Sequence, residues 1–233
     1  MIFDGNDLSR WLLVTSVKRA VAPSRRLTAT EVPGMAGAHV ADGGLGTLTV
    51  EVGAHLRAVA PADVSDLRRA LAAALHRDAA APLVLDDEPG RYLMAWYEGG
   101  AELSRNSHMP GVTLSFLCAD PVAYGEARTA TVSTTARQVL AGGTYRAWPT
   151  VTCKPASGSY WQLTNVTTGD YVRVDATFDG TQTVTLDMAA ERCLVNGSDH
   201  AVTVASDFFA LDGAQALKAS SGTATLEWDE RWL

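Results

Sequence analysis

Residues 171–188 have the sequence YVRVDATFDGTQTVTLDM, in which two alternating runs, 171–178 and 182–188, flank Asp179 and Gly180. Apolar and polar residues that alternate with a period of two are typical of half-buried strands. An Asp-Gly pair between two such runs predicts a tight β-hairpin. This stretch therefore predicts that the second half of the chain is built from antiparallel strands.

The same rhythm continues through the rest of the second half. Thr and Val are frequent there, no helical stripe occurs, and turn-forming residues recur about every ten residues. These turn signals lie at 142–143, 157–158, 168–170, 196–197, 212–213 and 221–222. Short strands with this spacing are typical of a β-sandwich, which we predict for residues 127–233.

The first half combines strands with one helix. Residues 64–76 carry an apolar stripe with a helical period, and Asp63 is well placed as the helix N-cap. The stripe consists of Val64, Leu67, Leu71 and Leu75. Strands are predicted at 11–17, 45–52, 82–85, 91–98 and 112–118. The predicted fold class is therefore mainly β, with an α+β N-terminal domain over residues 1–126.

Two stretches between the first two predicted strands do not have the composition of a hydrophobic core. Residues 20–32 form a polar, β-type segment that suits a sheet edge or an exposed arm. Residues 33–46 follow and are rich in glycine, which predicts a mobile loop or the tip of a hairpin.

Composition excludes several classes of protein. Hydrophobic residues make up 47% and charged residues 19% of the 233 residues, as in ordinary globular proteins. The formal net charge of -7 and the lack of a basic run disfavour direct nucleic-acid binding. The first residues lack a secretory signal and no stretch is apolar enough for membrane insertion, so we expect synthesis and folding in the cytoplasm. The three cysteines, Cys118, Cys153 and Cys193, are far apart in the sequence and are expected to be buried free thiols.

No residue pattern supports a catalytic, metal or cofactor site, so we predict that the chain is not an enzyme. The metal motif H-E-x-x-H and the nucleophile motif G-x-S-x-G are both absent. The densest acidic cluster, Asp86, Asp87 and Glu88, precedes Pro89 and Gly90. It is interpreted as a solvated turn, with acid–base chemistry or a divalent ion as the alternative.

The aromatic residues of the second half allow two interpretations. Tyr160 and Trp161, with Tyr145 and Trp148, could form a platform on which a sugar ring stacks. However, Trp161 alternates with Leu163 along a predicted strand, which fits a core position as well. Tyr160 and Trp161 are therefore candidate saccharide contacts, with core packing as the alternative.

Three segments of the first half resemble siphophage distal tail proteins. They are the opening FDGNDL at residues 3–8, LVLDDEPGRY at 83–92 and LSFLCADPVAYG at 114–125, the last being the most specific. The second half resembles the galectin-like domain of the same family through segments at 143–145, 148–149, 163–169 and 224–232. The resemblance spans nearly the whole chain.

The resemblance implies a structural role at the tail tip of a siphophage or prophage. Members of this family form a homo-hexamer through the N-terminal, ring-forming domain, and the galectin-like domains project outward. The ring links the tail tube protein to the tail-tip or tail-associated protein and to receptor-binding components of the baseplate. We therefore expect a virion tail-tip protein assembled in the host bacterial cytoplasm, without cofactors. The alternative function is a carbohydrate-binding module that contacts host cell-surface saccharide.

Overall fold

The computed structural model describes residues 1–58, 63–99 and 110–233. The chain divides into two compact units: unit 1 comprises residues 1–123 with Leu233, and unit 2 comprises residues 124–232. Strands account for 54% of the residues and the helix for 7%, so the predicted mainly β fold class is confirmed. The division falls a few residues before the predicted boundary at 126, because the polar residues there already belong to strand β10 (Ala123–Val132) of unit 2.

Unit 1 is built on a seven-stranded antiparallel sheet with the strand order β2-β1-β7-β8-β9-β6-β3. Its central strands alternate between buried and exposed residues, so one face of the sheet lies on the core. A short 3-10 helix, η1 (Leu8–Arg10), precedes β3. The strands are β1 (Ile2–Phe3), β2 (Asn6–Asp7), β3 (Leu12–Lys18), β6 (Leu48–Leu56), β7 (Ala81–Val84), β8 (Leu93–Gly99) and β9 (Gly111–Cys118).

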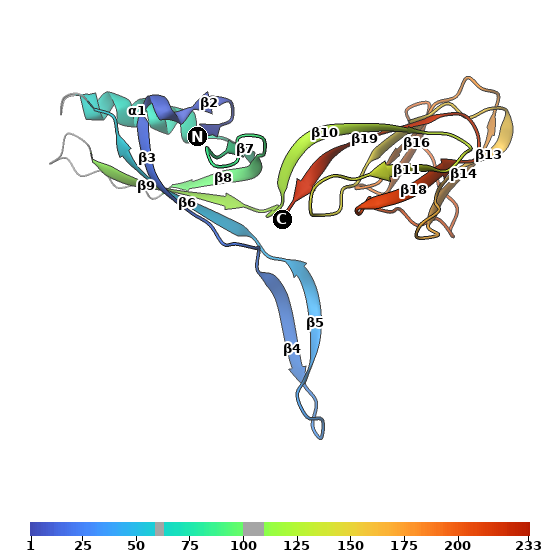
Figure 1. Cartoon of the computed structure of the whole chain (residues 1–233), viewed down its shortest axis with the longest axis horizontal. Coiled ribbons are helices and arrows are strands. Elements are labelled where there is room, and N and C mark those ends of the chain that lie inside the picture. Colours follow the sequence, from blue (N-terminus) through green and yellow to red (C-terminus); the bar gives the residue numbers. More distant parts are fainter. Residues whose placement is uncertain (59–62, 100–109) are drawn as a thin grey trace. The chain divides into compact units, whose positions relative to one another are not determined.

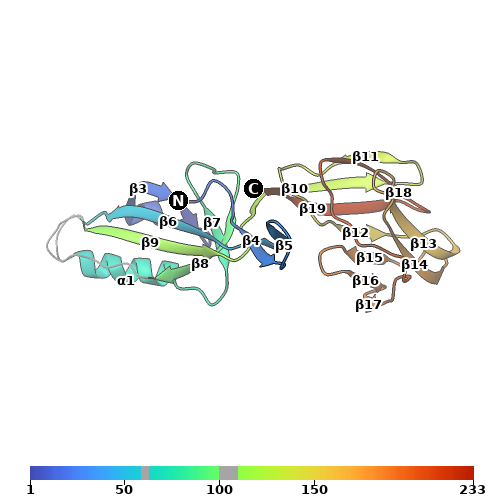
Figure 2. The same ribbon diagram turned by 90° about the horizontal axis from the view of Figure 1, so that it is seen from below.

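The helix α1 (Asp63–Leu75) packs on the core face of this sheet (Figure 2). Each end of the helix lies within one residue of the predicted range, 64–76. The helix buries Leu71 and Leu75, which belong to the predicted stripe, and also Ala74. Phe3 and Phe116 meet in the same core with their ring centroids 5.3 Å apart. The strands predicted at 91–98 and 112–118 are present as β8 and β9, and they pair with each other; most of the connection between them lies outside the described residues.

Two further strands, β4 (Arg25–Glu31) and β5 (Ala38–Leu45), pair with each other and form a separate two-stranded sheet. We call this ribbon the arm; Figure 1 shows it joined to unit 1 at its root. The exposed arm predicted from 20–32 is thus present. The glycine-rich stretch is a loop only at the tip, because residues 38–45 form β5. The strand predicted at 45–52 is consequently shifted to 48–56, since Leu45 still pairs with Arg25 in the arm.

Unit 2 is a β-sandwich. One sheet has six strands in the order β10-β19-β12-β15-β16-β17, and the other has four in the order β11-β18-β13-β14. Both sheets contribute to one hydrophobic core, which includes Trp161 and Val174 from the smaller sheet and Val151 and Leu186 from the larger. The remaining strands are β11 (Arg137–Leu140), β12 (Thr150–Cys153), β13 (Gly158–Asn165), β14 (Tyr171–Phe178), β15 (Val184–Asp187), β16 (Arg192–Val195), β17 (Ser198–Asp199), β18 (Ala214–Ala219) and β19 (Ala224–Trp232).

The hairpin predicted around Asp179 and Gly180 is wrong. β14 pairs with β13, whereas β15 pairs with β12 and β16, so the two runs lie in opposite sheets. β15 begins only at Val184, and the connection is too long for a tight two-residue turn. Asp179 shapes this connection, because its carboxylate accepts hydrogen bonds from the backbone N–H and the hydroxyl of Thr181 at 2.9 and 2.6 Å.

The three cysteines are free and buried, as predicted. Burial raises the pKa of Cys118 to about 12 and those of Cys153 and Cys193 to about 11. Because the thiolate is the reactive form, these thiols are poor nucleophiles while the protein is folded.

Candidate functional site

The arm has one apolar face and one polar face. In an antiparallel pair, residues directly opposite each other share a face, and successive residues alternate between faces. The register pairs Ala29 with Val40 and Glu31 with Ala38, and Leu27 faces Asp42 on the same side. Leu27, Ala29, Ala38 and Val40 therefore gather on one face of the ribbon, where Asp42 and Glu31 flank them at the two ends. The opposite face carries Thr28, Thr30, His39 and Ala41.

The apolar face of the arm lies open to solvent. Leu27 is 59% exposed and Val40 is 55% exposed, and two more large apolar residues, Val32 and Met35, are exposed at the tip. An isolated two-stranded hairpin is only marginally stable in water. Contiguous exposed apolar surface rimmed by polar groups usually marks an interaction site. The arm is therefore the first candidate surface for binding a partner.

The root of the arm is tied to unit 1. The backbone N–H of Gly46 donates a 2.6 Å hydrogen bond to the carbonyl of Ser24 where the two strands of the arm leave the sheet. A β-carbon at Gly46 would lie 2.5 Å from the Ser24 hydroxyl, so a larger residue here would require the Ser24 side chain to move. Arg19, just after β3, donates to Asp87 at 2.8 Å and to Glu88 at 3.0 Å.

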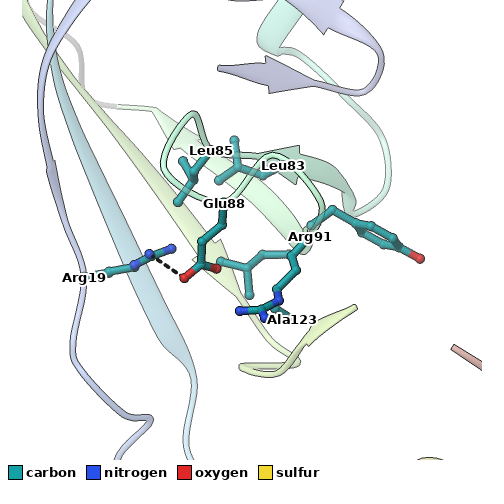
Figure 3. Close-up of a pocket in the computed structure, with 8 residues that line it drawn as sticks. Arg19, Leu83, Leu85, Glu88, Arg91 and Ala123 are labelled. Carbon is teal, nitrogen blue, oxygen red and sulfur yellow. Dashed lines mark hydrogen bonds and ion pairs between the residues drawn. The ribbon is translucent and has the colours of Figure 1, made fainter. Parts of the chain in front are cut away.

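Arg19 and Glu88 are among the residues that line a shallow hollow on unit 1 (Figure 3). Its apolar lining includes Leu83, Leu85 and Leu93. The acidic cluster predicted as a turn is a turn, and its carboxylates are ion-paired: Asp87 and Glu88 with Arg19, and Asp86 with the N-terminal ammonium group. In the ranges that the structure describes, no group of three or more His, Cys, Asp or Glu side chains is arranged to hold a metal ion.

Tyr160 and Trp161 point to opposite sides of β13. Trp161 is fully buried, and its indole N–H donates a 3.1 Å hydrogen bond to the carbonyl of Ser221. Trp161 therefore cannot contact a saccharide, and the alternative of core packing is the correct one for this residue. Tyr160 is 42% exposed, and the guanidinium carbon of Arg173 lies 4.2 Å from its ring centroid.

The structure does not show Tyr160 sharing a platform with Tyr145 and Trp148. The guanidinium carbon of Arg146 lies 5.8 Å from the Tyr145 ring centroid and 4.9 Å from that of Trp148, and Trp148 packs against the core of unit 2.

The apolar face of the arm was not predicted from the sequence. Its signal was the alternation of Leu27 and Ala29 with Arg26 and Thr28.

Two family models match the chain, one in each unit. Residues 7–118 match the phage tail protein RIFT-related domain, and residues 142–232 match the C-terminal domain of the siphovirus-type tail component. Over 220 residues the chain is 29% identical to the distal tail protein of Bacillus phage SPP1. The matched region covers 91% of this chain and 86% of that protein. The chain belongs to the siphophage distal tail protein family.

A solved structure of a distal tail protein has the same fold. The crystal structure of SPP1 Dit, described as a paradigm of the hub adsorption apparatus in phages that infect Gram-positive bacteria, matches with a TM-score of 0.86 and 24% identity. The match covers 100% of this chain and 98% of SPP1 Dit. The two family models and the SPP1 relative confirm the predicted family resemblance, and the protein is a structural tail component; its family is not an enzyme family. Within the described parts of this distal tail protein, no helix is both long and apolar enough to span a membrane.

Proposed function

We propose that this distal tail protein forms a homo-hexameric ring through unit 1, and that the ring links the tail tube to the tail tip. The ring-forming domain would comprise about residues 1–126, and the galectin-like domain, residues 127–233, would present its surface to other components. The observation that carries the proposal is the arm, whose apolar face is open in a single chain.

In a closed ring, the apolar face of every arm can be buried against a neighbouring subunit. In a head-to-tail ring, a patch on each subunit contacts a different patch on the next subunit. Because the ring is closed, no subunit is left with an unpaired patch. The arm also has two strand edges that can pair with a neighbouring strand. Burial of the apolar face would stabilise the contact by roughly 25 cal/mol for each Å² removed from water. The copy number of six is what the family resemblance implies.

The proposed partners are other components of the tail. They are the tail tube protein on one side of the ring and the tail-tip or tail-associated protein and receptor-binding components on the other. The hub adsorption role described for SPP1 Dit supports this placement. Assembly would take place in the host bacterial cytoplasm, from a phage or a prophage genome. The proposed role includes neither catalysis nor direct nucleic-acid binding.

The mass of the purified protein in solution tests the ring. We expect light scattering coupled to size exclusion to give six times the 24.7 kDa of one chain, and negative-stain images to show a central hole. If the chain alone is monomeric, the measurement is repeated with tail tube rings present, because a neighbouring ring can template assembly. A monomer under both conditions would contradict the proposal.

We keep a saccharide contact at Tyr160 as a second candidate function. The register places Asp175 opposite Tyr160, and Arg173 opposite Gln162, on the outer face of the smaller sheet. The Arg173 guanidinium lies over one face of the Tyr160 ring, so a sugar would stack on the other face, with polar side chains beside it to bind the sugar hydroxyls.

A binding experiment on host cell walls tests this second candidate. If it is correct, the protein binds the wall fraction saturably, and Tyr160→Ala reduces that binding about tenfold, as expected for the loss of roughly 1.4 kcal/mol. Leu140→Ala is the matched control, since Leu140 is exposed on the edge strand β11 of the same sheet. The candidate fails if no wall fraction binds, or if both variants bind as the unmodified protein does.

A further inference from the structure

We propose that Arg19 is a positioning residue that latches the root of the arm to the turn at residues 86–88 and so prepares the arm for assembly. The proposal builds on the ring described above, because the latch sets the geometry of the element that would join the subunits.

The position of Arg19 in the chain gives it control over the arm. It directly follows Lys18, the last residue of β3, and it precedes the segment 20–24 that leads into β4. Its two carboxylate partners belong to the turn between β7 and β8, which is distant in sequence but part of the same sheet. The ion pairs therefore connect the chain just before the arm to the turn that joins β7 and β8 of the unit 1 sheet.

The Arg19 contacts differ from a single exposed ion pair in their number and in the partial burial of the arginine. Most exposed single pairs contribute little, since water screens them and two side chains must be held in place. Here one guanidinium nitrogen of Arg19 donates to Asp87 at 2.8 Å and to Glu88 at 3.0 Å. The Arg19 side chain is 25% exposed, while those of Asp87 and Glu88 are 54% and 37% exposed. Figure 3 shows its guanidinium directed at Glu88 beside Leu85, within the hollow on unit 1. A single ordered side chain thus supports two interactions.

Val21, in the segment between Arg19 and β4, is fully exposed, and the hydrogen bond from Gly46 to Ser24 joins the two strands of the arm to each other. Loss of the Arg19 interactions would leave the arm attached to unit 1 by its backbone connections. An arm that samples many directions loses more conformational entropy on assembly, so the latch lowers the cost of forming the ring.

The distance between the tip of the arm and α1 tests the latch in the single chain, because a freely moving arm gives a broad distribution of distances. Spin labels would be placed on Ala36→Cys at the tip of the arm and on Arg69→Cys on the exposed side of α1, since the three native thiols are buried. We expect a narrow distribution that broadens in Arg19→Ala and in high salt, which screens ion pairs. Lys18→Ala is the control, because it removes a neighbouring positive charge that lies outside the latch. Equal widths for Arg19→Ala and the unmodified chain would overturn the proposal.

Assembly supplies a second, separate readout. Arg19→Ala should raise the protein concentration needed for ring formation by about tenfold, which corresponds to roughly 1.4 kcal/mol. Exchanging the charges, with Arg19→Glu together with Asp87→Arg and Glu88→Arg, should restore both the narrow distribution and assembly. If no ring forms even from the unmodified chain, the proposed function fails while the distance measurement still decides on the latch. If the ring forms equally well in Arg19→Ala, the latch has no role in assembly.

Discussion

The double replacement of Leu27 and Val40 by aspartate should convert the ring into monomers while leaving both units folded. Each side chain is more than half exposed in the single chain and belongs to neither hydrophobic core, so the midpoint of thermal unfolding should hardly change. In the proposed ring the same positions are buried against a neighbour. An unpaired charge placed there would cost several kcal/mol at every subunit contact. Light scattering should then give the mass of one chain.

A matched variant separates the apolar face from the arm as a whole. Thr28→Asp with Thr30→Asp adds the same charge to the polar face of β4, on the other side of the ribbon. We expect this control to retain the ring or to weaken it far less. A ring of unchanged mass in the Leu27 and Val40 variant would exclude the apolar face of the arm as the contact between subunits.

Trp161→Ala should destabilise unit 2 by about 3–5 kcal/mol, whereas Tyr160→Ala should change its stability by less than about 1 kcal/mol. The two residues are adjacent, but Trp161 is fully buried and Tyr160 is 42% exposed. Removal of the indole leaves a large cavity and also leaves the carbonyl of Ser221 without the Trp161 hydrogen bond. Trp161→Phe retains most of the volume and should lie between these two limits.

Pulsed alkylation of the cysteines in a denaturant series can show which unit is destabilised by Trp161→Ala. Cys153 and Cys193 lie in unit 2 and Cys118 lies in unit 1, and all three are buried. In Trp161→Ala, the two unit 2 thiols should become reactive at lower denaturant concentration than in the unmodified chain, while Cys118 keeps its transition. An unchanged transition for Cys153 and Cys193 would show that Trp161 does not support this core.

Local sequence patterns predicted most elements correctly because they depend on short-range periodicity. The stripe from Val64 to Leu75 has a helical period, and α1 forms there with Leu71 and Leu75 in the core. The alternation in residues 171–178 predicted β14, and its buried positions are the expected ones, such as Val172 and Val174. Family motifs added what periodicity cannot give, namely the relationship to distal tail proteins.

The sequence by itself thus determined the helix, most of the strands and, for these elements, the face that is buried. The tertiary structure alone decided which strands lie side by side, since alternation fixes the buried face of a strand but not its neighbour. For this reason β14 and β15 could not be placed in opposite sheets from their pattern, and the glycine-rich residues 38–45 could not be recognised as the second strand of the arm. The ion pairs of Arg19 join residues that are far apart in sequence, and only the folded sheet brings them within hydrogen-bonding distance.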